Sequence, residues 1–78
     1  MRRVTKVETR PEYILLVTFD DGVYGEVSMV EQLFGPMFEP MKDPEYFAQV
    51  CVDEFGAVCW PNGADLCPDA LYLQVTDQ

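Results

Sequence analysis

The sequence contains no histidine and a single serine, and both shortages restrict the chemistry that the protein can perform. Histidine is the usual general base and a common metal ligand near neutral pH. The one serine, Ser28, is already accounted for as a helix N-cap. Hairpins and turns explain the glycines better than a phosphate-binding loop does; these are Gly22, Gly25, Gly56 and Gly63. We therefore predict that the protein is not an enzyme and that it binds no cofactor.

Basic residues are also scarce, and the formal charge is −9. Of the 14 carboxylates only Glu8 lies in the first ten residues, so thirteen follow, against Lys42 as the only later cation. Such a surface repels a phosphate backbone, so direct binding to DNA or RNA is not expected. A basic partner protein, encoded nearby, is the natural complement. An acidic surface also serves solubility alone, and that alternative stays open.

Long hydrophobic runs are absent. The longest, from Tyr13 to Val17, has five residues, whereas a membrane span needs about 20. Arg2-Arg3 is not followed by the apolar stretch of a signal peptide. We expect a cytoplasmic protein without membrane association. Residues 1–78 make one domain with a small core, and small domains often gain stability by oligomerising, so we expect a homodimer.

Three cysteines recur at a spacing of eight: Cys51, Cys59 and Cys67. An odd number in such a chain favours reduced thiols over a disulfide framework. Because there is neither histidine nor a Cys-x-x-Cys pair, a zinc site would need all three thiolates and a carboxylate or water. The alternative is that these thiols pack as small hydrophobic side chains.

The segments on either side of Asp20-Asp21-Gly22 predict a β-hairpin. A three-residue loop that ends in a left-handed glycine is a common hairpin connection. With that loop Val17 faces Gly25, and the odd-numbered positions form one apolar face. Residues 4–8 predict a further strand, joined to the hairpin by a turn at Arg10-Pro11.

A short helix is predicted over residues 29–34. Ser28 is its expected N-cap, Glu31 completes a capping box three residues later, and Gly35-Pro36 is expected to end it. The apolar residues of this segment fit one helical face.

A second short helix is predicted over residues 43–49. Asp43 has the side chain of an N-cap, and Pro44 suits the first helical position. The methionines and Phe38 that precede it are expected to pack against the sheet.

A second hairpin is predicted around Glu54-Phe55-Gly56, between residues 50–53 and 57–60. This three-residue loop also ends in glycine. Its register places Cys51 opposite Cys59, which suggests a redox pair or half of a metal site. A two-residue loop would shift the register and separate the two thiols.

Residues 60–72 have the most distinctive composition of any segment in the chain. Pro61-Asn62-Gly63 predicts a turn, and Pro68 suits the first residue of a closing helix. Asp65 and Asp69 flank the start of that helix, where carboxylates interact favourably with the helix dipole. The same stretch holds the candidate interaction residues, which are Trp60, Asn62, Asp65 and Asp69.

The chain resembles a bacterial family of domains of unknown function, the family numbered 2442. The resemblance covers nearly the whole chain and is carried by Phe19 to Gly22, Leu33-Phe34, Pro40 to Phe47, and Trp60 to Tyr72. It implies a small α+β domain with an antiparallel sheet. Members of that family look like companions of small toxin proteins, which suggests an antitoxin-like or regulatory role. The resemblance implies no catalytic residue.

We predict an α+β fold in which a small antiparallel sheet, built from two β-hairpins, has short helices packed on one face. The predicted function is a non-enzymatic protein-interaction module, antitoxin-like or regulatory and carried on a mobile element. The alternative is a small thiol- or metal-binding protein that uses Cys51, Cys59 and Cys67.

Overall fold

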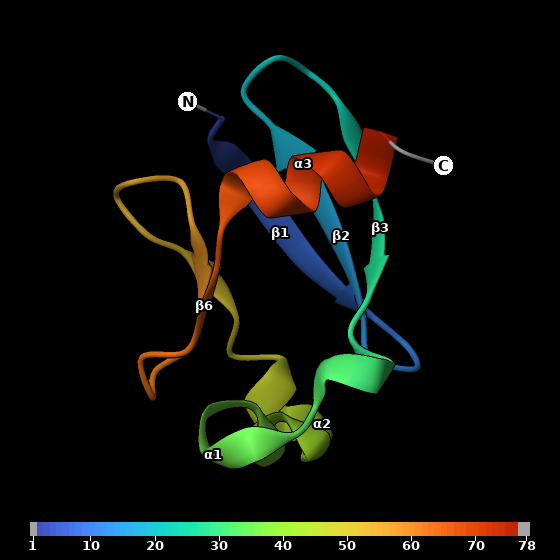
Figure 1. Ribbon diagram of the computed structural model, residues 1–78, viewed down its shortest axis with the longest axis vertical. Helices are drawn as coiled ribbons and strands as arrows, with labels where there is room; N and C mark the ends of the chain where they lie inside the picture. Colours follow the sequence, from blue (N-terminus) through green and yellow to red (C-terminus); the bar gives the residue numbers. More distant parts are fainter. Residues whose placement is uncertain (1, 77–78) are drawn as a thin grey trace.

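The computed structural model describes residues 2–76. Its larger sheet has three antiparallel strands in the order β1-β2-β3 (Figure 1), namely β1 (Val4–Arg10), β2 (Ile14–Phe19) and β3 (Tyr24–Ser28). Val17 lies opposite Gly25, and the N–H of Phe19 donates to the carbonyl of Val23 at 2.8 Å. The predicted hairpin register is therefore confirmed. Loop length and apolar alternation agree on this one pairing.

The strand predicted over residues 4–8 is also confirmed, and it is longer. β1 continues to Arg10, which lies opposite Ile14 on β2. The odd-numbered side chains of β2 and β3 point to the core as predicted, with Leu15, Val17, Phe19 and Val27 all buried.

The second hairpin belongs to a separate sheet of three short antiparallel strands in the order β4-β5-β6. These are β4 (Cys51–Val52), β5 (Val58–Cys59) and β6 (Asp65–Leu66). Cys51 lies opposite Cys59, as predicted. The two hairpins thus form two sheets instead of one, and β6 was not predicted. Because β6 contains Asp65, that residue lies in a strand and not at the start of the closing helix.

The helix predicted over residues 29–34 is wrong in most respects. Only a 3-10 turn forms, η1 (Val30–Gln32), and its N-cap Met29 makes no side-chain capping bond. Ser28 cannot cap it because Ser28 is still paired with Ile14 in the sheet. Gly35-Pro36 does not end a helix but begins one, α1 (Gly35–Phe38).

The segment that follows α1 holds the second predicted helix. It runs through a 3-10 helix, η2 (Glu39–Lys42), into α2 (Pro44–Phe47). The side chain of Asp43 caps α2 by accepting from the N–H of Glu45 at 3.0 Å, which confirms the predicted start. The helix is shorter than the predicted range of 43–49.

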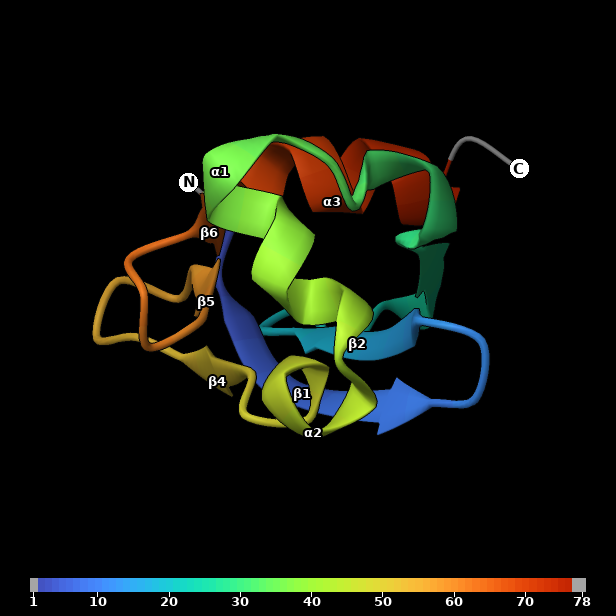
Figure 2. The ribbon, with the colours of Figure 1, turned by 90° about the horizontal axis from the view of Figure 1, so that it is seen from below.

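The closing helix α3 (Pro68–Thr76) begins at the predicted proline. It crosses the inner face of the β1-β2-β3 sheet (Figures 1 and 2). The second sheet and the segment from α1 to α2, which buries Met41 and Phe47, close the rest of the core. At Gly25 an added Cβ would lie 2.6 Å from Cγ1 of Val75, so a larger residue there would displace α3. None of the helices within residues 2–76 combines the length and hydrophobicity needed to cross a membrane.

Candidate functional site

Trp60, the first candidate interaction residue, is a core residue. It is 3% exposed, and its indole N–H donates to the carbonyl of Phe47 at 3.1 Å. Its ring packs against Phe38 and Phe47 at centroid distances of 6.4 and 6.0 Å. A buried aromatic with its polar atom satisfied stabilises the fold, so this side chain is not part of the surface.

Asn62 lies at the tip of the turn that joins β5 to β6. Its side-chain NH₂ donates to the carbonyl of Met37 at 2.8 Å, and its side-chain oxygen accepts from the N–H of Ala64 at 3.0 Å. The turn is closed by the N–H of Gly63, which donates to the carbonyl of Trp60 at 3.0 Å. The NH₂ group thereby holds the turn against α1, and the side-chain oxygen stabilises the turn itself.

The two aspartates of this stretch lie apart from Asn62 and from each other. Asp65 is exposed on β6, opposite Cys59. Asp69 lies in the first turn of α3, where its carboxylate accepts from the backbone N–H of Arg2 at 3.2 Å. The four candidate residues therefore do not form one site, and an interaction role for Asn62, Asp65 and Asp69 stays a prediction.

The three glycines expected at turns all have left-handed backbone conformations. Their φ angles are 89° at Gly22, 81° at Gly56 and 92° at Gly63. A Cβ at Gly56 would also lie 2.6 Å from the Cβ of Arg3. Gly56 therefore lets the β4–β5 turn approach the start of the chain closely.

A polar cluster connects α3 to the tip of the first hairpin. The hydroxyl of Tyr72 donates to the carboxylate of Asp21 at 2.7 Å, and the Arg2 guanidinium lies 4.0 Å from the centre of the Tyr72 ring. The hydrogen bond from Tyr72 lowers the pKa of Asp21 below its ordinary value of 3.8, with help from the N–H of Val23. The same bond raises the pKa of Tyr72 above 10.0.

Cys51 and Cys59 are neighbours across β4 and β5, with their sulfur atoms 3.4 Å apart. Cys51 is exposed, whereas Cys59 is partly buried. Burial, together with the hydrogen bond to Cys51, raises the pKa of Cys59 to about 11. At neutral pH Cys59 is therefore a thiol, and the exposed Cys51 is the side chain of the pair that reagents reach first.

Cys67 does not join this pair in a metal site. Within residues 2–76 no three Cys, His, Asp or Glu side chains are grouped so that they could hold a metal ion. The arrangement is that of a thiol pair, and the sequence had placed the pair correctly through the hairpin register.

A strained turn between β1 and β2 was missed by sequence reasoning. Glu12 and Tyr13 have φ angles of 68° and 62°, and left-handed conformations cost about 1–3 kcal/mol each for residues other than glycine. The turn is held in place by Tyr13, whose hydroxyl donates to the carbonyl of Lys42 and whose ring packs on Phe47. Neither glutamate nor tyrosine is typical of a left-handed turn, so the residue types at these positions did not predict it.

Two hollows flank this strained turn. One, of about 370 Å³, lies between the turn and α2 and is lined in part by Arg10, Pro44 and Phe47. The other, of about 360 Å³, lies where β3 ends and is lined by Glu12, Tyr13, Ile14, Ser28 and Val30. Tyr13 forms the wall between them.

The comparisons with known proteins agree with the motifs. A family model described as "Protein of unknown function (DUF2442)" matches residues 4–77. The chain belongs to this family. Neither the search of curated proteins nor the search of solved structures found a match. The family membership confirms the resemblance and leaves the role of the domain to be inferred from the surface.

We expect Asn62→Asp to lower the free energy of unfolding by about 1–3 kcal/mol, because the variant loses the donor to the Met37 carbonyl and brings a carboxylate against it. The control is Asp65→Asn, the reverse exchange at the neighbouring exposed position, which should change stability by less than about 0.5 kcal/mol. Urea denaturation measures both. Equal stability of the Asn62 variant and the wild type would contradict the structural role of this side chain.

We also expect Tyr72→Phe to make stability less dependent on pH in the acid range. Because the pKa of Asp21 is lowered in the folded state, its stabilising contribution is present above the unfolded value of 3.8 and is lost as pH falls through the lower folded value. The variant should therefore be less stable than the wild type at neutral pH, and the difference should shrink under strong acid.

The measurement is urea denaturation at neutral and strongly acidic pH, with NMR titration of the Asp21 carboxyl. In Tyr72→Phe the pKa of Asp21 should return toward 3.8. Tyr24→Phe, at an exposed tyrosine, is the control and should leave that titration unchanged. An Asp21 titration that is the same in both variants would contradict the assignment.

Proposed function

We propose that this domain is a non-enzymatic interaction module whose partner is a basic protein. The observation that carries the proposal is a group of exposed apolar side chains in residues 30–37, on a chain of formal charge −9. Large exposed apolar groups are costly in water and commonly mark interaction surfaces.

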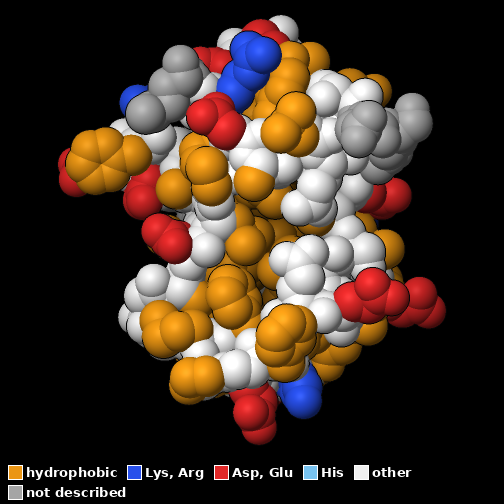
Figure 3. Space-filling view, in the orientation of Figure 1, with side chains coloured by type: hydrophobic (Ala, Val, Ile, Leu, Met, Phe, Trp, Pro, Cys, Tyr) orange, Lys and Arg blue, Asp and Glu red, His pale blue; other side chains and the backbone are white. Residues whose placement is uncertain are grey.

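Three exposed apolar side chains that lie within eight residues of one another in the chain, Val30, Phe34 and Met37, are here called the apolar patch. Their exposed fractions are 57%, 71% and 43%. Figure 3 displays the face on which α3 and α1 lie, with hydrophobic side chains in a band between them and carboxylates around its margin. An apolar centre with a charged rim is the usual anatomy of a protein interface.

The charge of the chain supports a basic partner. Lys42 is the only cation after residue 10, whereas thirteen carboxylates lie in that part of the sequence. A field of one sign speeds the encounter with a partner of opposite sign and disfavours like-charged proteins and nucleic acids. The lack of histidine supports the non-enzymatic part of the proposal, since the usual general base is missing.

An antitoxin-like or regulatory role is the form of this function that the family resemblance implies. In that form the basic partner is the protein encoded by the adjacent reading frame, and the domain neutralises it by covering its surface. A homodimer is part of the same proposal, because a second copy is another way to bury the apolar patch in so small a chain.

The test is binding between the domain and the protein encoded next to it, measured by isothermal titration calorimetry with wild type and Phe34→Ser. We expect Phe34→Ser to weaken binding about tenfold or more, because truncation of a central aromatic commonly costs an interface over 1 kcal/mol. Phe55→Ser is the matched control, since Phe55 is 67% exposed on the β4–β5 turn, away from the apolar patch.

Unchanged affinity of Phe34→Ser would remove the apolar patch from the proposal. Absence of any binding, with no rescue of growth when the neighbouring gene is expressed, would overturn the proposed partner. Sedimentation of the free protein tests the homodimer separately. A monomer at all concentrations would overturn that part.

A second candidate function is thiol redox chemistry, and the 3.4 Å separation of the Cys51 and Cys59 sulfurs favours it. In a directly opposed antiparallel pair the Cα atoms lie about 4.5–5.5 Å apart, within the range that a disulfide spans. Oxidation by a peroxide would join the two sulfur atoms. The thiols would give up two protons and two electrons, and the peroxide would be reduced to water or to an alcohol and water.

Intact-mass measurement after treatment with hydrogen peroxide tests this candidate. We expect the loss of two hydrogen atoms in the wild type and in Cys67→Ser, and no such loss in Cys51→Ser. In alkylation without oxidant Cys59 should react last, because its pKa of about 11 keeps it protonated. Three thiols that alkylate at equal rates and form no disulfide would rule the candidate out.

A further inference from the structure

β3 leaves one edge of the larger sheet open. At its two ends Phe19 donates to Val23 and Met29 donates to Tyr13, so the odd-numbered residues of this strand direct their backbone groups toward β2. Because the direction alternates along a strand, the backbone groups of Tyr24, Glu26 and Ser28 point away from β2. Within residues 2–76 no strand pairs with that side of β3.

The opposite edge of the same sheet is covered at its start. At the start of β1 the N–H of Val4 donates to the carbonyl of Gly56 at 2.9 Å, and the side chain of Arg3 donates to the carbonyl of Glu54 at 2.7 Å. The β4–β5 turn therefore covers the start of β1. The edge of β3 has no such contact with another strand or turn within residues 2–76, so a further strand has room to pair along its whole length.

A hollow lies at one end of the open edge. It is the hollow of about 360 Å³ lined by Ile14, Ser28 and Val30, with Glu12 and Tyr13 on its other side. Ile14 and Ser28 lie opposite each other on β2 and β3. An apolar side chain from a strand added to β3 would reach this hollow from the position beside Ser28, since alternate residues of a strand point to the same face.

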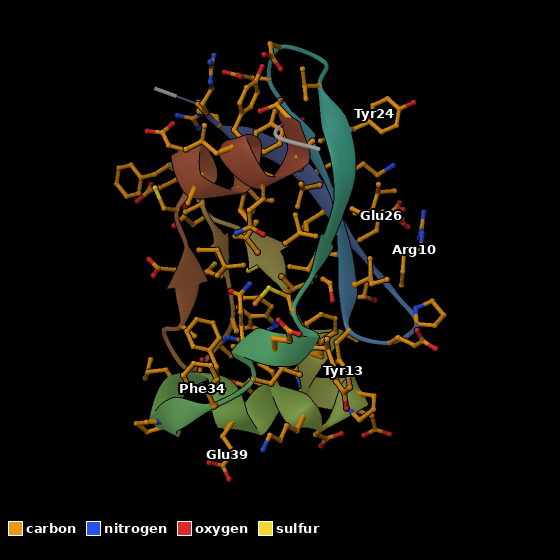
Figure 4. All side chains as sticks on the ribbon, turned by 45° about the vertical axis from the view of Figure 1, so that its right-hand side comes forward. Arg10, Tyr13, Tyr24, Glu26, Phe34 and Glu39 are labelled. Carbon is orange, nitrogen blue, oxygen red and sulfur yellow. The ribbon has the colours of Figure 1, made fainter. Side chains whose placement is uncertain are left out.

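The carboxylate of Glu26 lies at the centre of the edge. Figure 4 shows Tyr24, Glu26 and Arg10 pointing to the outer side of the sheet, away from α3. On that face Glu8 is paired with Lys6 at 3.3 Å and with Arg10 at 3.1 Å. Glu26 has no ion-pair partner among residues 2–76, so a basic side chain of an added strand would complement it.

A second copy of this chain is a poor occupant of the edge. In the register that overlaps the two β3 strands fully, a two-fold axis would pair Tyr24 with Ser28 of the other copy and would place Glu26 opposite Glu26. Like charges directly opposite each other destabilise a strand pair. Charge complementarity therefore favours a different, basic chain.

We propose that an extended segment of a basic partner protein binds by pairing with β3 as a fourth strand. Main-chain hydrogen bonds to Tyr24, Glu26 and Ser28 provide affinity, a Lys or Arg beside Glu26 provides charge complementarity, and an apolar residue two positions away fills the hollow at Ser28. This inference rests on the proposed function and specifies how the basic partner is bound.

The probe is a capped peptide, KLTKTLK, which reads the same in both directions and so presents a central lysine between two leucines whichever way it runs. Hydrogen exchange measured by NMR gives the direct readout. In the free protein the amides of Gly25 and Val27 should exchange slowly, and those of Tyr24, Glu26 and Ser28 fast. With the peptide bound, these three amides should become protected together.

Charge reversal at the edge is the second arm. Glu26→Lys should weaken binding of the peptide about tenfold and should improve binding of ELTETLE, in which glutamate replaces lysine. Glu39→Lys is the matched control, because it makes the same change of net charge at the start of η2, away from the edge (Figure 4). The affinity of this variant for either peptide should stay within about twofold of that of the wild type. Added salt should remove this small difference, because it screens the long-range effect of the net charge.

Three outcomes would overturn the proposal: no binding of KLTKTLK, binding without protection of the three edge amides, or equal effects of Glu26→Lys and Glu39→Lys. Dimerisation that protects the same amides in the absence of peptide would replace the basic segment with a second copy. A different result separates the two proposals: the neighbouring protein binds, Phe34→Ser weakens that binding, and the edge amides stay unprotected. In that case the proposed function stands and this binding mode fails.

Discussion

Trp60 lies where the second sheet meets α1 and α2, and its burial links these three parts of the chain. The β4-β5-β6 sheet has strands of only two residues each, which is too short for ladder hydrogen bonds alone to hold it. The indole packs on Phe38 and Phe47 and donates to the carbonyl of Phe47. Asn62 reaches α1 from the adjoining turn. These contacts close the core.

The small size of the chain explains why its binding features lie at the margins of the larger sheet. A domain of this length buries only about 60% of the surface of its unfolded chain. α3 covers the inner face of the sheet, and Gly25 lets it pack closely through Val75. The outer face and the β3 edge have no such cover within residues 2–76. Edges of this kind are usually protected by charge. The carboxylate of Glu26 disfavours pairing with acidic chains and with a second copy of this chain.

The two hairpins could be predicted because several local signals agreed. In each, a three-residue loop ending in glycine determines which residues face each other, and the apolar alternation selects the same register. Cys51 and Cys59 were brought together by this reasoning alone. The helix over residues 29–34 failed because Ser28 satisfied the capping pattern but stayed paired with Ile14 in the sheet. Pairing in the sheet outweighed the local capping preference.

The candidate site was less predictable than the fold. Trp60, Asn62, Asp65 and Asp69 are close in sequence, yet the turn after β5 sends Asn62 toward α1 and leaves Asp69 beside Arg2. The left-handed Glu12 and Tyr13 carry no sequence signal, because contacts of Tyr13 with Lys42 and Phe47 hold that turn in place. Those contacts join residues about thirty positions apart, which local patterns do not register.

By itself the sequence determined the α+β class, the hairpin registers, the capped start of α2 and the acidic character of the surface, because each depends on residues close together in the chain or on composition. Only the tertiary structure decided that the hairpins form separate sheets, that Asp65 joins a third short strand, that Val30, Phe34 and Met37 are exposed, and that no strand among residues 2–76 pairs with the outer side of β3. A strand edge is open when no other segment packs beside it, and this depends on where every other segment of the fold lies.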